Sequence, residues 1–323
     1  MLIDTIFFLL GFIFLIKGAD LLVDGSSSIA KKYGISNFVI GLTIVAFGTS
    51  MPELLVSTLA SFKGSAGVAL GNIIGSNISN TLLILGISAV IRPLLVKKNT
   101  VNKEIPFSLL AVLAVGFLVN DKIIDGFQSS ILTRIDGFVL ILFFVIFIYY
   151  TFGISKDEST ILESISEEKI ETYKFYHSAA LIMAGLVGLY FGGEWIVGSA
   201  INFAKIFNIS ETLIGLTIIA VGTSLPELAA SAVAAYRGKT DIAVGNVVGS
   251  NIFNILWVLG ISSVIAPIPF STILNVDFFI LFAVTILLLF LIFVGKRNIL
   301  GRVEGSFLIF LYIIYLIFII FRG

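Results

Sequence analysis

Long apolar stretches separated by short polar ones dominate the pattern of this chain. A helix that crosses a bilayer needs about 20 mostly apolar residues, and ten stretches of roughly this length can be marked out. They are unbroken runs of Leu, Ile, Phe and Val, unlike the alternating segments of about 10 residues typical of a transmembrane β-barrel. The pattern therefore predicts ten membrane-spanning helices, at 3–30, 36–61, 66–91, 104–119, 132–152, 176–204, 210–236, 240–265, 272–294 and 303–321.

The second half of the chain repeats the first at a constant offset of 174 residues. "GLTIVAFGTSMPELLVSTLAS" in the first half aligns with "GLTIIAVGTSLPELAASAVAA", and "GNIIGSNISNTLLILG" aligns with "GNVVGSNIFNILWVLG". About 25 of the 46 paired positions in 41–86 and 215–260 are identical, which a shared apolar composition would not produce. We interpret these two stretches as the central motifs of an internal repeat.

Each repeat holds five helices, and five is an odd number. The second repeat must therefore enter the membrane from the opposite side, which is the inverted-repeat arrangement of secondary transporters, with the transport site near the midplane. The predicted fold is an all-α polytopic membrane protein with two inverted five-helix repeats, 1–152 and 176–323, joined by a hydrophilic linker at 153–175.

Composition agrees with a membrane protein and narrows the chemistry. Hydrophobic residues make up 58% of the chain and charged residues 12%, too few to cover a water-soluble domain of this size. The chain has no cysteine, so disulfides and thiolate metal sites are excluded.

The distribution of Lys and Arg between alternate loops predicts the orientation, because these residues accumulate on the cytoplasmic side. One set of loops holds fourteen of them and the other set holds five. We therefore expect a multi-pass protein of the cell membrane with both termini outside and the 153–175 linker in the cytoplasm. The larger set comprises Lys31, Lys32, Arg92, Lys97, Lys98, Lys103, Lys156, Lys169, Lys174, Arg237, Lys239, Lys296, Arg297 and Arg302, and the smaller comprises Lys63, Lys122, Arg134, Lys205 and Arg322.

Two carboxylates, Glu53 and Glu227, fall inside apolar segments at equivalent repeat positions. An ionised carboxylate at the centre of a spanning helix costs roughly 2.5–3.5 kcal/mol on insertion scales. No Lys or Arg lies near the middle of these helices, so protons or bound cations must offset the charge. Two converging carboxylates carry a formal charge of −2, which matches one divalent ion.

Oxygen-bearing residues surround each carboxylate in the sequence. Pro52 and Pro226 each leave a carbonyl of the preceding turn without its helical partner, and neighbouring Thr and Ser residues add hydroxyls. Hard oxygen ligands of this kind suit sodium and calcium. The following helix of each repeat carries a polar stripe at every fourth residue, formed by Asn72, Ser76 and Asn80 in the first repeat and by Asn246, Ser250 and Asn254 in the second.

Simpler explanations account for these residues one at a time. Gly and Ser often serve helix packing, a proline can be only a kink, and a single protonated Glu can be structural. None of these explains why the whole set recurs at symmetric positions. Asp20 and Glu194 are also related by the repeat, with an ion-pathway role and a structural role both open, and His177 is interpreted as an interfacial residue beside the linker.

The motifs "GTSMPE", "GTSLPE", "GNIIGSN" and "GNVVGSN" resemble those of the sodium/calcium exchangers of the cation/calcium antiporter superfamily, in their prokaryotic ten-helix form. The resemblance implies alternating access to a central site for which calcium and sodium compete, with the first and sixth helices sliding past the rest. It implies a transporter rather than an enzyme, without a cofactor. By motif position the implied ion ligands are Ala46 through its carbonyl, Thr49, Ser50, Glu53, Ser76 and Asn80, and in the second repeat Ala220 through its carbonyl, Thr223, Ser224, Glu227, Ser250 and Asn254.

One position departs from the family pattern. Some members carry Asp where this chain has Asn254, whereas both Asn80 and Asn254 are amides here, which leaves the sodium stoichiometry and any potassium requirement open. The proton-coupled branch typically has Glu and His where this chain has "GNIIGSN", so proton coupling ranks lower.

The leading hypothesis is a sodium/calcium antiporter that expels calcium down the sodium gradient. The alternative is a calcium/proton or other cation exchanger, followed by a cation channel or a membrane scaffold. The expected partners are calcium and sodium ions and the lipid bilayer, with no nucleic acid, and the expected functional unit is a monomer.

Overall fold

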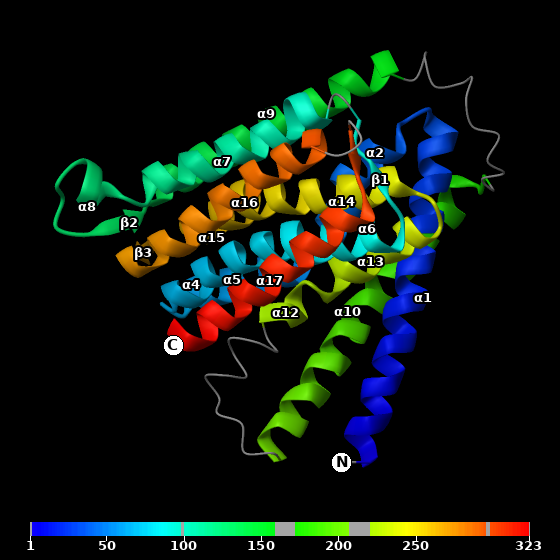
Figure 1. The fold of residues 1–323 in the computed structure, drawn as a ribbon, viewed down its shortest axis with the longest axis horizontal. Helices are drawn as coiled ribbons and strands as arrows, with labels where there is room; N and C mark the ends of the chain where they lie inside the picture. The colour runs from blue at the N-terminus through cyan, green and yellow to red at the C-terminus, as the bar shows by residue number, and fades with distance from the viewer. Residues whose placement is uncertain (1, 98–99, 159–171, 207–219, 295–297, 323) are drawn as a thin grey trace.

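A computed structural model of the chain describes residues 2–97, 100–158, 172–206, 220–294 and 298–322, and almost all of them are helical (Figure 1). The first half contains α1 (Leu2–Tyr33), α2 (Asn37–Ile40), the π-helical turn η1 (Gly41–Val45), α3 (Ala46–Thr49), α4 (Met51–Phe62), α5 (Ala66–Ser79), the π-helical turn η2 (Asn80–Ile84), α6 (Leu85–Ile91), β1 (Leu94–Leu95), the π-helical turn η3 (Thr100–Glu104), α7 (Ile105–Leu118), α8 (Asp121–Ile124), β2 (Ser130–Leu132) and α9 (Arg134–Glu158). The second half contains α10 (Phe175–Ile206), α12 (Ala220–Thr223), α13 (Leu225–Tyr236), α14 (Thr240–Ile252), the π-helical turn η6 (Phe253–Val258), α15 (Leu259–Ile265), β3 (Ile268–Phe270), the 3₁₀ turn η7 (Thr272–Leu274), α16 (Asn275–Val294), β4 (Ile299–Leu300) and α17 (Arg302–Arg322).

Nine of the ten predicted membrane spans are present as helices in the part of the chain that the structure describes. Eight helices in the described residues are long and apolar enough to cross a membrane, and a ninth span is the pair Asn37–Thr49 and Met51–Phe62, bent by 46°. The tenth, predicted at 210–236, is described only from Ala220 onward, as α12 and α13. Of the linker predicted at 153–175, the part up to Glu158 continues α9 as helix, and residues 159–171 lie outside the described part. The two inverted five-helix repeats expected from the sequence are confirmed as the fold.

Two spans form the centre of the bundle. In Gly67–Ile91 and in Thr240–Ile265, 78% of the most apolar window is buried, against 22% in α9 and in α17. These central spans carry the repeated glycine and asparagine motifs. In the second of these spans Gly245 and Gly249 explain part of the burial, since an added Cβ would lie 2.5 Å from the carbonyl oxygen of Phe38 and 2.4 Å from that of Leu42, respectively. Backbone contact of α14 with the α2–η1 segment therefore requires glycine, as small-residue packing motifs do in membranes.

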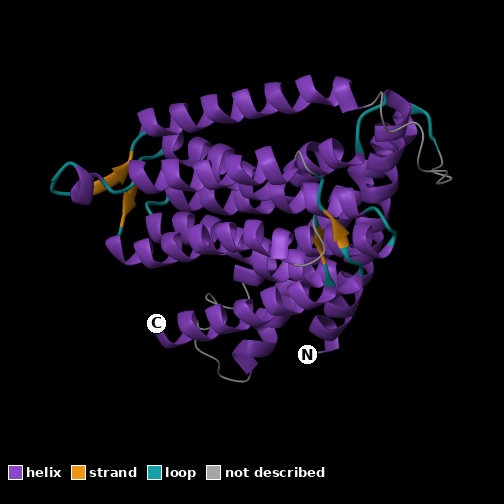
Figure 2. Cartoon of the chain, turned by 45° about the horizontal axis from the view of Figure 1, so that its top comes forward, coloured by secondary structure: helices purple, strands orange, loops and turns teal. Residues whose placement is uncertain are grey.

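Two short strand pairs show which loops lie at the same end of the helix bundle, and so test the assignment of alternate loops to opposite sides of the membrane. β1 pairs with β4 and β2 pairs with β3, both antiparallel, and Figure 2 shows the two pairs at opposite ends of the helix bundle. The β1 and β4 loops both belong to the Lys- and Arg-rich set, and the β2 and β3 loops both belong to the other. The structure therefore groups the loops by end as the charge pattern predicts.

The helices α1 and α10 form an antiparallel pair that crosses the other helices at a steep angle (Figure 1). Glycines allow the two backbones to touch: a Cβ at Gly18 would lie 2.8 Å from the carbonyl oxygen of Gly185, and one at Gly11 would lie 2.9 Å from that of Gly192. These two contacts are related by the repeat offset, because Gly11 corresponds to Gly185 and Gly18 to Gly192. The contact between α1 and α10 is therefore symmetric, because the repeat exchanges the two glycine contacts with each other.

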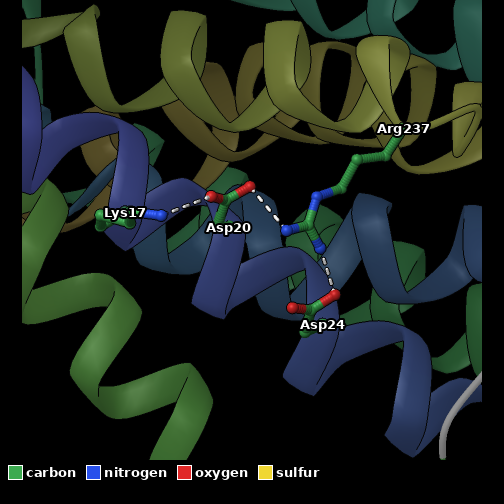
Figure 3. A network of polar contacts seen from close by, with 4 residues as sticks. All are labelled: Lys17, Asp20, Asp24 and Arg237. Carbon is green, nitrogen blue, oxygen red and sulfur yellow. Dashed lines mark hydrogen bonds and ion pairs between the residues drawn. The ribbon is translucent and has the colours of Figure 1, made fainter.

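The second half of α1 is held to the end of α13 by charges (Figure 3). Arg237, which follows the last residue of α13, lies 2.8 Å from Asp20 and also pairs with Asp24, both on α1, and Lys17 lies 4.0 Å from Asp20. Arg237 lies at the β1–β4 end, because the neighbouring Gly238 is close to Arg92, which precedes β1. Asp20, for which the sequence left two roles open, therefore has a structural ion pair here.

Candidate cation site

The backbone breaks just before each of the two buried carboxylates. Ser50 separates α3 from α4 with φ −84° and ψ 9°, and Ser224 separates α12 from α13 with φ −88° and ψ 6°. Pro52 and Pro226 therefore lie in the first turn of a new helix, where a missing N–H has no helical partner to lose, rather than in the middle of a continuous one. Broken helices of this kind line ion sites in transporters.

Each carboxylate follows its break directly and is fully buried. Glu53 and Glu227 lie in the first turns of α4 and α13, and both have 0% exposure. Ser76 donates to Glu53 Oε1 at 3.3 Å, and Ser50 donates to Glu227 Oε1 at 2.9 Å. The second bond joins the two repeats, so the carboxylates of both halves reach the same interior.

Several oxygens around these carboxylates have no hydrogen-bond partner among the described residues. Buried polar atoms normally have one, and an unpaired buried carboxylate oxygen is costly. All of them are hard oxygens of the type that binds sodium and calcium, so a cation fits this donor set. They are Glu53 Oε2, Asn80 Oδ1, Ser224 Oγ, Glu227 Oε2, Ser250 Oγ and Asn254 Oδ1.

The charge of the site comes from two groups. Within the described ranges no cluster of three or more His, Cys, Asp or Glu residues could hold a metal ion, and no Lys or Arg is paired with Glu53 or Glu227. The two carboxylates therefore match one divalent charge, with neutral oxygens completing the coordination.

The two threonines bond to asparagines of the polar stripe. Thr49 donates to Asn246 Oδ1 at 3.1 Å, and the Asn246 amide donates to Ser231 at 2.9 Å. The other repeat makes the equivalent bonds, from Thr223 to Asn72 at 3.3 Å and from Asn72 to Ser57 at 3.0 Å. A hydroxyl that donates keeps its lone pairs for a cation, so both threonines remain candidate ligands.

The two backbone ligands implied by the motifs are the carbonyl oxygens of Ala46 and Ala220. The Ala46 carbonyl accepts the Ser50 N–H at 3.0 Å and lies 3.4 Å from the Thr49 hydroxyl, whose single proton goes to Asn246 Oδ1 at 3.1 Å. One lone pair of the carbonyl therefore remains for an ion. Ala220 is the first residue of α12, and its side chain lies outside the described part.

The side-chain ligands predicted from sequence are brought into one interior. Each of them is between 0% and 9% exposed: Thr49, Ser50, Glu53, Ser76, Asn80, Thr223, Ser224, Glu227, Ser250 and Asn254. Asn80 and Asn254 lie in π-helical turns, a distortion frequent at functional sites. His177 stacks on Tyr173 at 4.6 Å next to the linker, away from this interior.

Sequence reasoning missed a layer of residues behind these candidate ligands. Ser57 and Ser231 accept from the stripe asparagines, and Asn77 and Asn251 accept from the amides of Asn254 and Asn80. Their identity in both repeats was the available signal. Thr81, which bonds to Asn251, carries no such signal, because Ile255 is its repeat counterpart.

An inverted pair of five-helix repeats around two buried carboxylates is the architecture of a secondary active cation transporter. The chain belongs to the sodium/calcium exchanger protein family, whose model matches residues 3–153 and 177–321. The family and the fold together support cation/calcium antiport.

Individual relatives agree with this assignment. The chain is 40% identical to the putative antiporter CaxA of Alkalimonas amylolytica over 315 residues, 97% of each chain. It is 32% identical to the sodium/calcium exchanger MaX1 of Methanosarcina acetivorans, over 96% of this chain and 97% of the relative. Among solved structures it is similar to the sodium-calcium exchanger NCX_Mj, with a TM-score of 0.80, 36% identity and coverage of 97% of each chain.

Proposed function

We propose that this chain exchanges sodium for calcium by alternating access, and that both ions use the site between Glu53 and Glu227. The burial of two carboxylates with unpaired oxygens and no basic partner among the described residues carries this proposal. A single calcium ion balances both charges, and sodium ions balance them in turn. The names of MaX1 and NCX_Mj support sodium as the counter-ion.

The ligand set that we propose comprises the twelve residues named from the motifs, with the carboxylates bridging the ion and the hydroxyl and amide oxygens completing its coordination. All of these groups come from one chain, so the site needs no second copy. We infer that the monomer is the functional unit.

Flux in reconstituted vesicles tests the coupling ion. Purified protein is placed in liposomes, and uptake of radioactive calcium is measured with an outward gradient of sodium, potassium or protons imposed singly. We expect the sodium gradient alone to drive uptake. Uptake driven only by protons would assign the chain to calcium/proton exchange, and no uptake with any gradient from correctly folded protein would overturn antiport itself.

We further propose that the β1–β4 end faces the cytoplasm and both termini lie outside the cell membrane. The chain has no native cysteine, so a single introduced cysteine is the only thiol that can be labelled, and it shows on which side of the membrane its position lies. Thr172→Cys, in the predicted linker, should react with an impermeant thiol reagent only from the cytoplasmic side, and Ser129→Cys, next to β2, only from outside. The reverse labelling would overturn this orientation while leaving the fold intact.

A further inference from the structure

Four buried asparagines meet where the two central spans cross. Asn77 and Asn80 lie at the junction of α5 and η2, and Asn251 and Asn254 lie at the junction of α14 and η6. Their exposures are 0%, 1%, 7% and 0%. Only Asn80 and Asn254 are candidate ion ligands, so the other two need a different explanation.

Each candidate ligand amide donates its nitrogen to an asparagine of the other repeat. Asn80 Nδ2 donates to Asn251 Oδ1 at 3.1 Å, and Asn254 Nδ2 donates to Asn77 Oδ1 at 3.0 Å. The offset of 174 converts one bond into the other. The carbonyl oxygens of Asn80 and Asn254 have no partner in the described structure.

An amide side chain can turn either its oxygen or its NH₂ group toward a site, and the two orientations have nearly the same shape. An NH₂ group facing a cation would repel it, whereas the oxygen can bind it. The acceptors Asn77 Oδ1 and Asn251 Oδ1 favour the orientation with the nitrogen bonded away from the site. The partner of each ligand amide therefore determines which atom the ion meets.

The two acceptors are themselves held in place. Asn77 Nδ2 donates to the Asn251 backbone carbonyl at 3.0 Å, and Asn251 Nδ2 donates to Thr81 Oγ1 at 2.9 Å. The Thr81 hydroxyl donates in turn to the Asn77 backbone carbonyl at 2.9 Å. Turning the Asn77 amide would set its oxygen against the Asn251 carbonyl and its NH₂ group against that of Asn254. Turning the Asn251 amide would require Thr81 to give up its bond to the Asn77 carbonyl. The bonds together therefore favour one orientation.

We propose that Asn77 and Asn251 are positioning residues of the cation site, which fix Asn254 and Asn80 with their oxygens toward the ion. Thr81 completes the network from the first repeat alone, since its counterpart Ile255 has no hydroxyl. The proposal rests on the proposed function, because it takes Asn80 and Asn254 as ligands. Partners behind metal ligands commonly change metal affinity by about 10–100-fold.

A double-mutant cycle tests the proposal. Equilibrium calcium binding is measured on purified protein in sodium-free detergent solution for wild type, Asn77→Leu, Asn254→Ala and the double variant. We expect Asn77→Leu to weaken calcium binding about 10-fold in the wild-type background and to have almost no further effect once Asn254 is alanine. An equal loss in both backgrounds would show a general structural effect and overturn the positioning role.

The other repeat supplies a crossed control. Asn77 does not bond to the Asn80 side chain, so combining Asn77→Leu with Asn80→Ala should multiply the two losses. If wild type binds calcium saturably but the losses in the first cycle simply add, only the positioning role of Asn77 is refuted. Absence of calcium binding by folded wild type would instead remove the proposed function.

Thr81 offers milder variants in case Asn77→Leu fails to fold. Thr81→Val removes the hydroxyl that holds Asn251 and should weaken calcium binding several-fold, by the same argument, whereas Thr81→Ser should retain wild-type binding. Ile255→Val is the matched control at the symmetric position and should change nothing. Equal calcium affinities for Thr81→Val and Thr81→Ser would overturn the network.

Discussion

The two repeats carry the same serines around the two carboxylates, but these serines make different contacts. In the first repeat Ser50 donates to Glu227 and Ser76 donates to Glu53. In the second repeat the equivalent hydroxyls, of Ser224 and Ser250, have no partner in the described structure. An identical motif therefore does not guarantee identical bonding, even with the ligand residues buried in both halves.

A second difference lies at the ends of the bundle. Arg237 holds Asp20 and Asp24 at the β1–β4 end, whereas Lys63 and Glu194, the repeat equivalents of Arg237 and Asp20, are exposed and form no ion pair with each other. The bonds from Asn80 to Asn251 and from Asn254 to Asn77, by contrast, are equivalent in the two repeats. The repeats thus agree in the bonds between these asparagines and differ in the serine contacts beside the carboxylates and in the pairing of charges.

Removing either carboxylate should have the largest effect and should affect both repeats alike. Glu53→Gln and Glu227→Gln each keep the shape but remove half of the charge that balances a divalent ion. We expect each to lower calcium exchange more than 100-fold, consistent with several kcal/mol of lost charge stabilisation, in vesicles containing folded protein. Asp125→Asn, an exposed carboxylate outside the site, is the control. Near-normal flux in either Gln variant would refute the two-carboxylate site.

Asn254→Asp should change the pH dependence of exchange. An ionised carboxylate would place −3 against the +2 of calcium and would face the Asn77 oxygen, to which Asn254 now donates. Only a protonated Asp can donate there, so we expect proton uptake with calcium, or binding of an extra monovalent cation, in place of the wild-type stoichiometry. Exchange measured against pH at fixed sodium checks this, and Asn80→Asp should behave similarly because Asn80 makes the equivalent bond to Asn251. Superimposable curves for wild type and Asn254→Asp would remove Asn254 from the ligand set.

Adding a Cβ at a glycine between α1 and α10 should lower the stability of the protein, and by the same amount at two positions related by the repeat. Gly11→Ala and Gly185→Ala place a Cβ within 2.9 Å and 2.7 Å of the partner backbone, and overpacking of this kind typically costs about 1–3 kcal/mol. Unfolding in detergent measures the loss. Gly116→Ala in α7, where a Cβ would meet nothing within 4 Å, is the control, and equal stabilities for all three variants would contradict the close approach.

The smallest effect is expected where the repeats differ in charge pairing. Arg237→Gln removes two partly exposed ion pairs, each of a type worth about 0–1 kcal/mol, whereas Lys63→Gln removes none. We expect a measurable loss of unfolding free energy at low salt for Arg237→Gln alone, with the difference shrinking as salt screens the pairs. Equal losses for the two variants would mean that the ion pairs of Arg237 do not contribute to the free energy of unfolding.

Much of this protein was predictable from the sequence because the relevant signals are local or repeated. The length of an apolar segment predicts whether it can span a bilayer as a helix. The 174-residue repeat holds an odd number of helices, so the second copy must have the opposite orientation in the membrane. Glu53 and Glu227 were identifiable because a carboxylate in an apolar segment needs a partner that the sequence does not supply. The sequence thus determined the membrane class, the inverted repeat and the residues that line the buried centre.

The tertiary structure decided how those residues are used. The breaks at Ser50 and Ser224 place each proline in a first helical turn, although the same motif reads equally well as a kinked continuous helix. Whether Ser50 donates to a carboxylate, and which way the amides of Asn80 and Asn254 turn, depends on groups 171 to 177 residues away in the chain. The bonds from Asn254 to Asn77 and from Ser50 to Glu227 exist only after two repeats, brought from opposite sides of the membrane, have packed against each other.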